Sequence, residues 1–210
     1  MRVTKKIKEE QLAILERVYF DAKPELVFNT PFELLIAVIL SAQCTDKRVN
    51  IVTARLFQKA STPEAIIELG LSALEEEIHD CGFFHNKAKN IMATCHRLVE
   101  EYNGEVPEKF EQLLALPGVG RKTANVVASV AFGYPAIAVD THVFRIANRL
   151  KLAMGETPEE VELGLMKAIP KEKWSAAHHW LIWHGRRICK ARKPLCDACP
   201  LRDVCPSFSG

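Results

Sequence analysis

Hydrophobic positions along the chain follow helical spacing. Leu34 to Leu40 is an apolar run without a polar side, which is typical of a helix buried on every face. A second, amphipathic pattern opens at Pro107 and ends at Leu116. Its apolar face consists of Phe110, Leu113 and Leu114. Alternating strand patterns with hairpin turns are missing, so the sequence predicts an all-α fold of about ten short helices.

Capping sequences mark the expected helix starts. Thr30-Pro31-Phe32-Glu33 and Thr157-Pro158-Glu159-Glu160 each combine a threonine cap, a proline at the first helical position and a glutamate that can reach back to the cap amide. Thr62-Pro63 has the cap and the proline, and Ser72-Ala73-Leu74-Glu75 has the capping box alone. We expect a helix to begin after each cap.

Composition is that of a globular protein, with 48% hydrophobic and 26% charged residues. The longest uncharged run, residues 123–139, is interrupted by Gly133 and Pro135 and is shorter than the roughly 20 residues of a membrane span. The basic N-terminus leads into no apolar segment with a cleavage site, so it is not a secretory signal. We expect a cytoplasmic protein that binds no membrane.

Charge is distributed unevenly although the net charge is only +2. Residues 62–80 carry six acidic and no basic side chains, whereas residues 186–193 carry five basic and no acidic ones. Such asymmetry suggests that one face meets a polyanion. A solvated surface would have the same charges, so charge alone leaves both interpretations open.

A glycine-containing turn separates the amphipathic helix from a second predicted helix. Leu116-Pro117-Gly118-Val119-Gly120 is followed by a helical stretch from Arg121 to Phe132, which Gly133 stops. Glycines allow close approach to backbone amides at the start of a helix, where the dipole favours an anion. An ordinary helix–helix turn is the alternative, and the Pro-Gly-Val-Gly-Arg-Lys string favours a phosphate site.

Lys122 and Asp140 flank this second helix. Lys122 lies in its first turn, where the positive end of the dipole disfavours the ammonium, as a nucleophilic amine requires. Asp140 follows an extended return and is expected to cap a helix that starts at Thr141. A helix of about 12 residues advances about 18 Å. A return of about seven residues can span about 23 Å, so the two side chains could share one site. Taken singly, Lys122 is better interpreted as an exposed lysine and Asp140 as a simple helix cap.

Four of the seven cysteines are clustered. Cys189, Cys196, Cys199 and Cys205 fall within 17 residues, a pattern of metal ligands in a reducing compartment. Their spacing alone fits zinc and an iron–sulfur cluster equally. The scattered Cys44, Cys81 and Cys95 are interpreted as buried or quiet thiols.

Taken together, these motifs resemble the endonuclease III family of helix–hairpin–helix DNA glycosylases. The matching strings cover nearly the whole chain in order and are Pro31–Val38, Leu40–Gln43, Asn103–Pro107, Leu116–Ala124, Val139–Val143 and the four cysteines. The resemblance implies two helical lobes: a six-helix domain over 22–133, and a discontinuous domain of 1–21 plus 134–210. It also implies a 4Fe–4S cluster on the four cysteines, in a loop spanning 189–205.

The resemblance further implies a bifunctional DNA glycosylase/AP lyase that acts on oxidised pyrimidines of the thymine glycol type. Lys122 would attack C1′, displace the base and form a Schiff base, and β-elimination would nick the strand 3′ to the lesion. Asp140 would stabilise positive charge on the sugar. The partner would be damaged double-stranded DNA, bound by a monomer that associates with the nucleoid.

Contacts to DNA are implied for a larger set of residues. Gln43 would enter the space left by the base and Phe83 would wedge into the opposite strand, although Phe83 departs from the family's smaller residue and fits core packing equally well. Ser41 and Asp46 would line or brace the pocket. The remaining expected contacts are Gly118, Gly120, Arg121, Thr123, His142, Lys190, Arg192 and Lys193.

Three rival functions are less consistent with the sequence. Adenine-mismatch glycosylases share the hairpin, aspartate and cysteines but lack the lysine and carry a further C-terminal domain. The 8-oxoguanine glycosylases keep the lysine but generally not the cluster. A non-catalytic DNA-binding module would explain the hairpin and the cysteines but leave Lys122 and Asp140 as coincidence.

Overall fold

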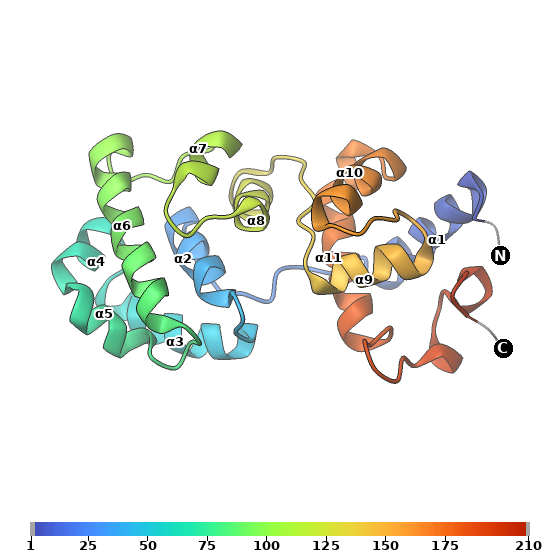
Figure 1. Ribbon diagram of the computed structural model, residues 1–210, viewed down its shortest axis with the longest axis horizontal. Coiled ribbons are helices and arrows are strands. Elements are labelled where there is room, and N and C mark those ends of the chain that lie inside the picture. The colour runs from blue at the N-terminus through green and yellow to red at the C-terminus, as the bar shows by residue number, and fades with distance from the viewer. Residues whose placement is uncertain (1–2, 209–210) are drawn as a thin grey trace. The chain divides into compact units, whose positions relative to one another are not determined.

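The computed structural model describes residues 3–208, and this part of the chain is entirely helical (Figure 1). It contains eleven α-helices and three short 3-10 helices and no strand, which confirms the all-α prediction. The α-helices are α1 (Lys5–Val18), α2 (Pro31–Ser41), α3 (Asp46–Lys59), α4 (Pro63–Leu69), α5 (Leu71–Ile78), α6 (Phe84–Tyr102), α7 (Phe110–Ala115), α8 (Arg121–Phe132), α9 (Thr141–Leu150), α10 (Pro158–Ala168) and α11 (Trp174–Arg187). The 3-10 helices are η1 (Lys171–Lys173), η2 (Cys196–Ala198) and η3 (Arg202–Val204). Within residues 3–208, no helix has the length and apolar character needed to cross a membrane.

The chain divides into two compact units. The continuous unit runs from Pro24 to Gly133 and holds α2 to α8. The discontinuous unit joins the segment that ends at Lys23 to the segment that begins at Tyr134, and so combines α1 with α9 to α11. Each unit has its own hydrophobic core. The chain therefore folds around two separate cores.

The core of the continuous unit is built around α2. Every residue from Phe32 to Leu40 is buried, as the apolar run predicts for a central helix. Figure 1 shows α2 inside its unit, where it packs against α3, α6 and α8. Because α8 packs on this rigid centre through Ala124, Val127 and Ala128, the start of α8 has a fixed position within the unit.

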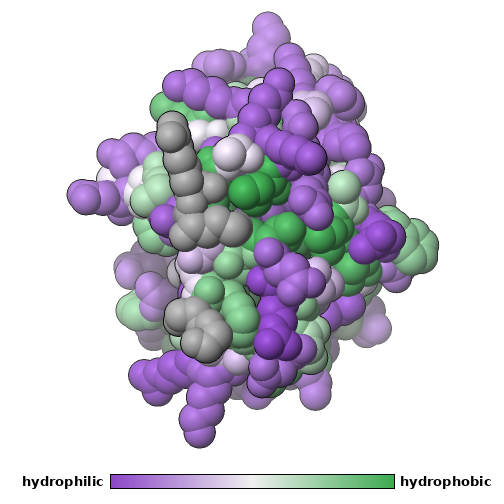
Figure 2. Space-filling view, turned by 90° about the vertical axis from the view of Figure 1, so that its right-hand side faces the viewer, coloured by the Kyte–Doolittle hydropathy of each residue, from purple (hydrophilic) through white to green (hydrophobic). Residues whose placement is uncertain are grey.

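The core of the discontinuous unit brings α1 together with α9 and α11. Leu15, Ile146 and Leu181 are fully buried, and Trp180 and Trp183 join them. On the face of this unit that Figure 2 shows, hydrophilic side chains surround a smaller area of hydrophobic ones. The N-terminal segment is thus integral to the unit formed by the last third of the chain.

Three of the four predicted threonine and serine caps are confirmed. The hydroxyls of Thr30, Thr62 and Thr157 accept hydrogen bonds from the backbone N–H of the third residue of α2, α4 and α10 respectively. In α2 and α10 the glutamate side chain reaches one residue further back than expected. Glu33 accepts from the amide of Asn29, and Glu160 accepts from that of Glu156.

Two predicted helix starts are wrong. Gly70, with φ +81°, both ends α4 and precedes α5, so α5 begins at Leu71 and Ser72 lies inside its first turn rather than at its cap. The helix expected from Pro107 begins only at Phe110 and ends at Ala115. Its Leu113 is buried but Leu114 is 42% exposed, because neighbouring residues on a helix point about 100° apart.

Candidate functional site

The turn between α7 and α8 presents the start of α8 to solvent. Gly118 has φ +73°, and a Cβ there would lie 2.8 Å from Cβ of Asn90 on α6. Thr94, also on α6, donates its hydroxyl hydrogen to the Pro117 carbonyl at 2.7 Å. No side chain caps α8, whose N-cap residue is Gly120. The exposed start of this helix can therefore offer its amides to an anion.

Lys122 and Thr123 lie in the first turn of α8. The Lys122 side chain is exposed, and Thr123 is partly exposed. Arg121, beside them, places its guanidinium 5.5 Å from the centre of the Phe110 ring of α7. Asn125, three residues after Lys122, is buried, and its Nδ2 has no hydrogen-bond partner in the structure. The Lys122 amine therefore lies at the exposed side of a helix whose opposite side packs in the core.

Asp140 is the N-cap of α9, as predicted. Its Oδ1 accepts hydrogen bonds from the amides of His142 and Val143, both at 2.8 Å. The return that leads to it is anchored, because residues 137–139 are buried and Nδ1 of His178 bonds to the Ala138 carbonyl at 2.8 Å. Both cap bonds end on Oδ1, so Oδ2 is not used by the cap. Asp140 belongs to the discontinuous unit, whereas Lys122 belongs to the continuous one.

His142 connects this cap to the cysteine loop, residues 189–205, through Arg145. The imidazole is partly buried, and burial lowers its pKa while Asp140 acts in the opposite direction. Nη2 of Arg145 lies 3.2 Å from Nδ1 of His142. The same guanidinium donates hydrogen bonds to the Gly185 carbonyl at 2.9 Å and to the Cys189 carbonyl at 3.2 Å. The sequence gives no indication of Arg145's role, since its backbone partners lie about 40 residues away.

The four clustered cysteines line one pocket with mostly apolar walls. They carry no disulfide, and the same pocket is lined by Leu150, His184, Ile188, Pro194, Leu195, Arg202 and Phe208. Within residues 3–208, no three His, Cys, Asp or Glu side chains gather closely enough for one metal ion. Four thiols that share one pocket are a donor set that fits an iron–sulfur cluster, which is held by four cysteine thiolates.

Two side chains point nitrogen atoms at these sulfurs. Nη1 of Arg149 donates to Sγ of Cys189 at 3.3 Å, and Nε2 of His184 lies 3.8 Å from Sγ of Cys199. The Tyr19 hydroxyl is 2.9 Å from Nδ1 of His184, and burial raises the pKa of Tyr19 to about 12, so it remains a donor. With Nδ1 accepting, Nε2 carries the hydrogen that faces Cys199. Arg149 and His184 are therefore positioned to donate hydrogen bonds to the thiolates of Cys189 and Cys199 when these bind a cluster.

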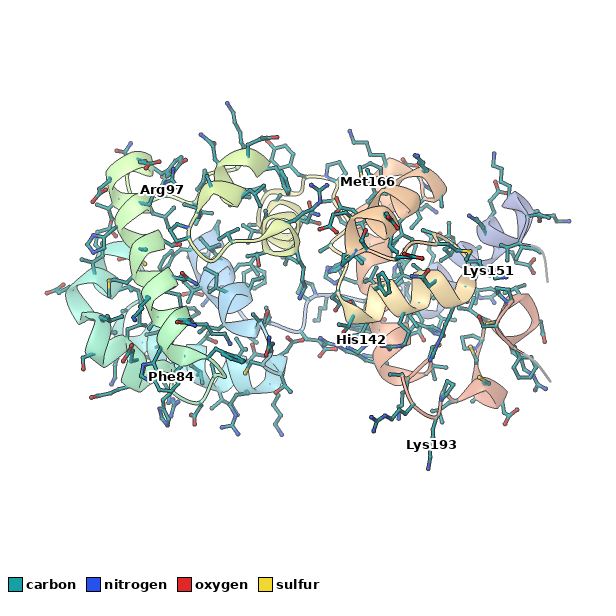
Figure 3. All side chains as sticks on the ribbon, viewed as in Figure 1. Phe84, Arg97, His142, Lys151, Met166 and Lys193 are labelled. Atoms are coloured by element: carbon teal, nitrogen blue, oxygen red, sulfur yellow. The ribbon has the colours of Figure 1, made fainter. Side chains whose placement is uncertain are left out.

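The basic residues of the cysteine loop are exposed. Lys190, Arg192 and Lys193 all lie on the surface, and Lys193 extends outward from the loop (Figure 3). Lys193 also has φ +51°, a left-handed backbone. Arg149 donates to the carbonyls of Lys190 and Ala191 at 2.8 and 3.1 Å, which ties this basic stretch to α9.

A second group of expected site residues lies on two loops of the continuous unit. Gln43, just after α2, has φ +53° and an exposed side chain. Phe83, just before α6, has φ +58° and is 65% exposed, so core packing does not explain it. Ser41 donates to the Val38 carbonyl, and Asp46 lies in the first turn of α3.

Lys87 holds the first of these loops and was not anticipated from the sequence. Its side chain is 6% exposed, and its Nζ donates to the carbonyls of Leu40 and Ala42 at 2.8 and 2.7 Å. These carbonyls end α2 immediately before Gln43. A lysine in an α6 pattern gives no sign that it is buried, so only the fold reveals this contact.

Comparisons with known proteins identify the family. A family model described as HhH-GPD superfamily base excision DNA repair protein matches residues 36–171, and one for the iron-sulfur binding domain of endonuclease III matches residues 189–205. Endonuclease III of Haemophilus influenzae is 57% identical over 86% of each chain. That of Escherichia coli K12 is 55% identical over 86% of each chain.

Solved structures give the same result. A trapped covalent intermediate of endonuclease III with DNA has a TM-score of 0.94 and 52% identity, and the match covers 98% of this chain and 97% of that one. A thermostable thymine-DNA glycosylase has a TM-score of 0.88 at 23% identity, over 99% of each chain, and so shares the fold.

Proposed function

Because the chain belongs to the HhH-GPD superfamily of base excision DNA repair proteins and, within it, to the endonuclease III family, we propose that its substrate is an oxidised pyrimidine of the thymine glycol type in duplex DNA. The protein is a DNA glycosylase with AP lyase activity, and it carries the family's 4Fe–4S cluster.

Lys122 is the nucleophile in this proposal. The observation that carries it is an exposed amine in the first turn of α8, directly after a turn suited to bind a phosphate. The neutral amine attacks C1′ of the damaged nucleotide, the bond from C1′ to the base breaks, and the base leaves with its electron pair. Opening of the sugar gives a Schiff base, and loss of a proton from C2′ then expels the 3′ phosphate. The strand is thereby nicked 3′ to the lesion.

Asp140 supports these steps as a carboxylate. The two amides that bond to Oδ1 fix the orientation of its carboxyl group. A fixed negative charge stabilises positive charge that develops on the sugar as the base departs. The same group can accept or return the proton that moves during ring opening.

Removing a base requires that the nucleotide leave the stack, and two exposed side chains are suited to fill the gap. We assign Gln43 to the space left by the base and Phe83 to the opposite strand. Both stand on loops, have left-handed backbone and expose their side chains. Ser41 and Asp46 border the first loop and would line or brace the base pocket.

The remaining contacts go to the phosphate backbone. Gly118, Gly120, Arg121 and Thr123 surround the start of α8, and His142 lies near the Asp140 cap (Figure 3). The cluster, bound by Cys189, Cys196, Cys199 and Cys205, fixes the loop that carries Lys190, Arg192 and Lys193. Each phosphate that these cations neutralise should steepen the loss of affinity with salt by about one unit of log–log slope.

Borohydride trapping tests the proposed reaction. Reduction should freeze the Schiff base as a covalent adduct on a duplex with thymine glycol, and Lys122→Ala should abolish it. Lys167→Ala, which changes an exposed lysine of α10, is the matched control and should leave the adduct intact.

The substrate duplexes separate the parts of the proposal. An adduct with a pre-formed abasic site but none with thymine glycol would show that the base substrate is wrong. An adduct that persists in Lys122→Ala would show that another amine is the nucleophile.

A further inference from the structure

The two loops that carry Gln43 and Phe83 lie side by side. We call residues 42–45 the Gln43 loop and residues 79–83 the Phe83 loop. A Cβ built on Gly82 would lie 3.5 Å from the Gln43 carbonyl oxygen, so the backbones of the two loops pass close to each other.

Each loop contains a cysteine at the point of contact. Cys44 packs against the core that contains Cys81, and the two thiols interact electrostatically. Cys81 is fully buried, whereas Cys44 is partly exposed. The Cys44 amide bonds to the Ser41 carbonyl at 3.1 Å and the Cys81 amide to that of Ile78 at 2.9 Å, so both thiols stand in turns directly after helices. One accessible thiol is thus paired with one protected thiol.

A buried cation lies beside this pair. The Lys87 ammonium interacts electrostatically with both thiols while donating to the Leu40 and Ala42 carbonyls. Burial raises the pKa of Cys81 to about 11, and Lys87 acts against that rise. A neighbouring cation stabilises a thiolate when it forms, which is the environment of redox-active cysteines.

We propose that Cys44 and Cys81 are an oxidation site for hydroperoxides, and that the disulfide they form links the Gln43 and Phe83 loops and suppresses base removal from duplex DNA. The modification itself follows from the cluster of two thiols and Lys87. Its effect on activity rests on the proposed function, because that function assigns Gln43 and Phe83 to the DNA.

The chemistry uses one hydroperoxide for each disulfide. The Cys44 sulfur attacks the outer peroxide oxygen, the O–O bond breaks, an alcohol or water leaves, and Cys44 becomes a sulfenic acid. The Cys81 sulfur then attacks the Cys44 sulfur, the S–O bond breaks, and water departs with the Cys81 proton. Two thiols lose two electrons in total, and the peroxide gains them. A small thiol reductant reverses the link by exchange.

The expected consequence is local. Cys44 adjoins Gln43 in sequence, and Cys81 is two residues from Phe83. A bond between the two sulfurs fixes the distance between the loops, so Gln43 cannot enter the gap independently of Phe83. Chemistry on a single-stranded abasic site requires no gap to be filled, and it should proceed unchanged.

The test treats the intact, cluster-loaded enzyme with one equivalent of hydrogen peroxide and then removes the excess. Peptide mapping by mass spectrometry should find a linked pair of peptides containing Cys44 and Cys81. Base removal from a thymine glycol duplex should fall about tenfold or more, as expected when a group that positions substrate is misplaced, and dithiothreitol should restore it. Nicking of single-stranded abasic DNA and the visible absorbance of the cluster should not change.

Two variants serve as controls, and the activity of each after peroxide treatment is compared with the activity of the same variant before treatment. Cys44→Ser should form no link and lose no activity on peroxide treatment. Cys95→Ala, which removes a buried thiol elsewhere in the same core, should respond as the wild type does.

Absence of the Cys44–Cys81 peptide pair would overturn the modification, and a linked enzyme with full activity on the duplex would overturn its effect. An enzyme that never removes thymine glycol would contradict the proposed function instead, and the peptide map would still decide whether the disulfide forms.

Discussion

The turn between α7 and α8 and the cysteine loop are both irregular segments that we assign to DNA, but different interactions hold them in place. The turn is short, and Leu116 and Val119 anchor it in the core of the continuous unit. In residues 189–205, Leu201 alone is buried. The cysteine loop is instead held by Arg145 and Arg149, which donate to its carbonyls and, from Arg149, to the sulfur of Cys189.

This difference separates two ways of building an anion-binding surface. At the turn, the anion site consists of backbone amides, so its geometry depends on helix packing and on one left-handed glycine. At the cysteine loop the site consists of long cationic side chains, whose placement depends on bonds made by residues far along the chain. A substitution in the α7–α8 turn should therefore change the local geometry of the site. Loss of a contact that holds the cysteine loop should free the whole loop.

Loss of one cluster ligand should produce the largest effect. We expect Cys199→Ser to lose the visible absorbance of the cluster and the hydrogen-exchange protection of residues 186–205, and to bind duplex DNA about 100-fold more weakly because the basic stretch is released. Amides of α2 should keep their protection. Cys95→Ala is the control, and equal loss of protection in both units would refute the independence of the two segments.

Gly118→Ala should strain the turn between α7 and α8 but leave it packed on the core. A Cβ would meet Asn90 at 2.8 Å, and φ is +73°, so we expect the free energy of unfolding to fall by about 2 kcal/mol. Gly120→Ala should cost less than about 1 kcal/mol, because φ is −89° and no atom lies within 4 Å of the new Cβ. Urea unfolding measures both. Equal losses would mean that the left-handed backbone is not what distinguishes Gly118.

Lys87→Met should test whether a buried cation positions the Gln43 loop as Arg149 positions the cysteine loop. Without the two bonds to the Leu40 and Ala42 carbonyls, we expect kcat for base removal from a damaged duplex to fall about tenfold, with little change in KM. Nicking of single-stranded abasic DNA should be unaffected. Lys89→Met, two residues along α6 and exposed, should behave as wild type. A parallel loss of both activities would indicate general unfolding instead.

Helix ends with local signals could be predicted from the sequence. The caps at Thr30 and Asp140 and the bounds of α8 agree with the structure because each depends on groups within four residues of one another. The start of α5 could not be predicted from its capping box, since Gly70 closes the preceding helix and leaves no room for a cap at Ser72.

Contacts that position the candidate site were harder to foresee. Lys87 bonds to a carbonyl 47 residues away, Arg149 to one 41 residues away, and Arg145 to one 44 residues away. Hydrophobic periodicity describes one helix at a time, so it cannot show which distant carbonyl a lysine or arginine side chain will bond to. The roles proposed for Lys122, Asp140, Gln43 and Phe83 remain predictions that the experiments above address.

Low pH should destabilise the discontinuous unit more than the continuous one, and this is the smallest effect that we predict. In α11, burial lowers the pKa of His179 from its ordinary 6.5 to about 3, and the neighbouring His178 adds to the shift. Between these values the unfolded chain binds a proton that the folded chain does not, so stability is full above pH 6.5 and is lost as pH falls below it. Because His179 is only half-buried, we expect a loss of about 1 kcal/mol between about pH 7.5 and about pH 5.

His142 and His184, whose pKa values burial also lowers, belong to the same discontinuous unit, so hydrogen exchange at low pH should rise there first. His179→Gln should reduce the loss of stability measured by urea unfolding. His96→Gln, an exposed position on α6, should not change it. If both variants respond to pH as the wild type does, the acid sensitivity of this unit has a source other than the His179 imidazole.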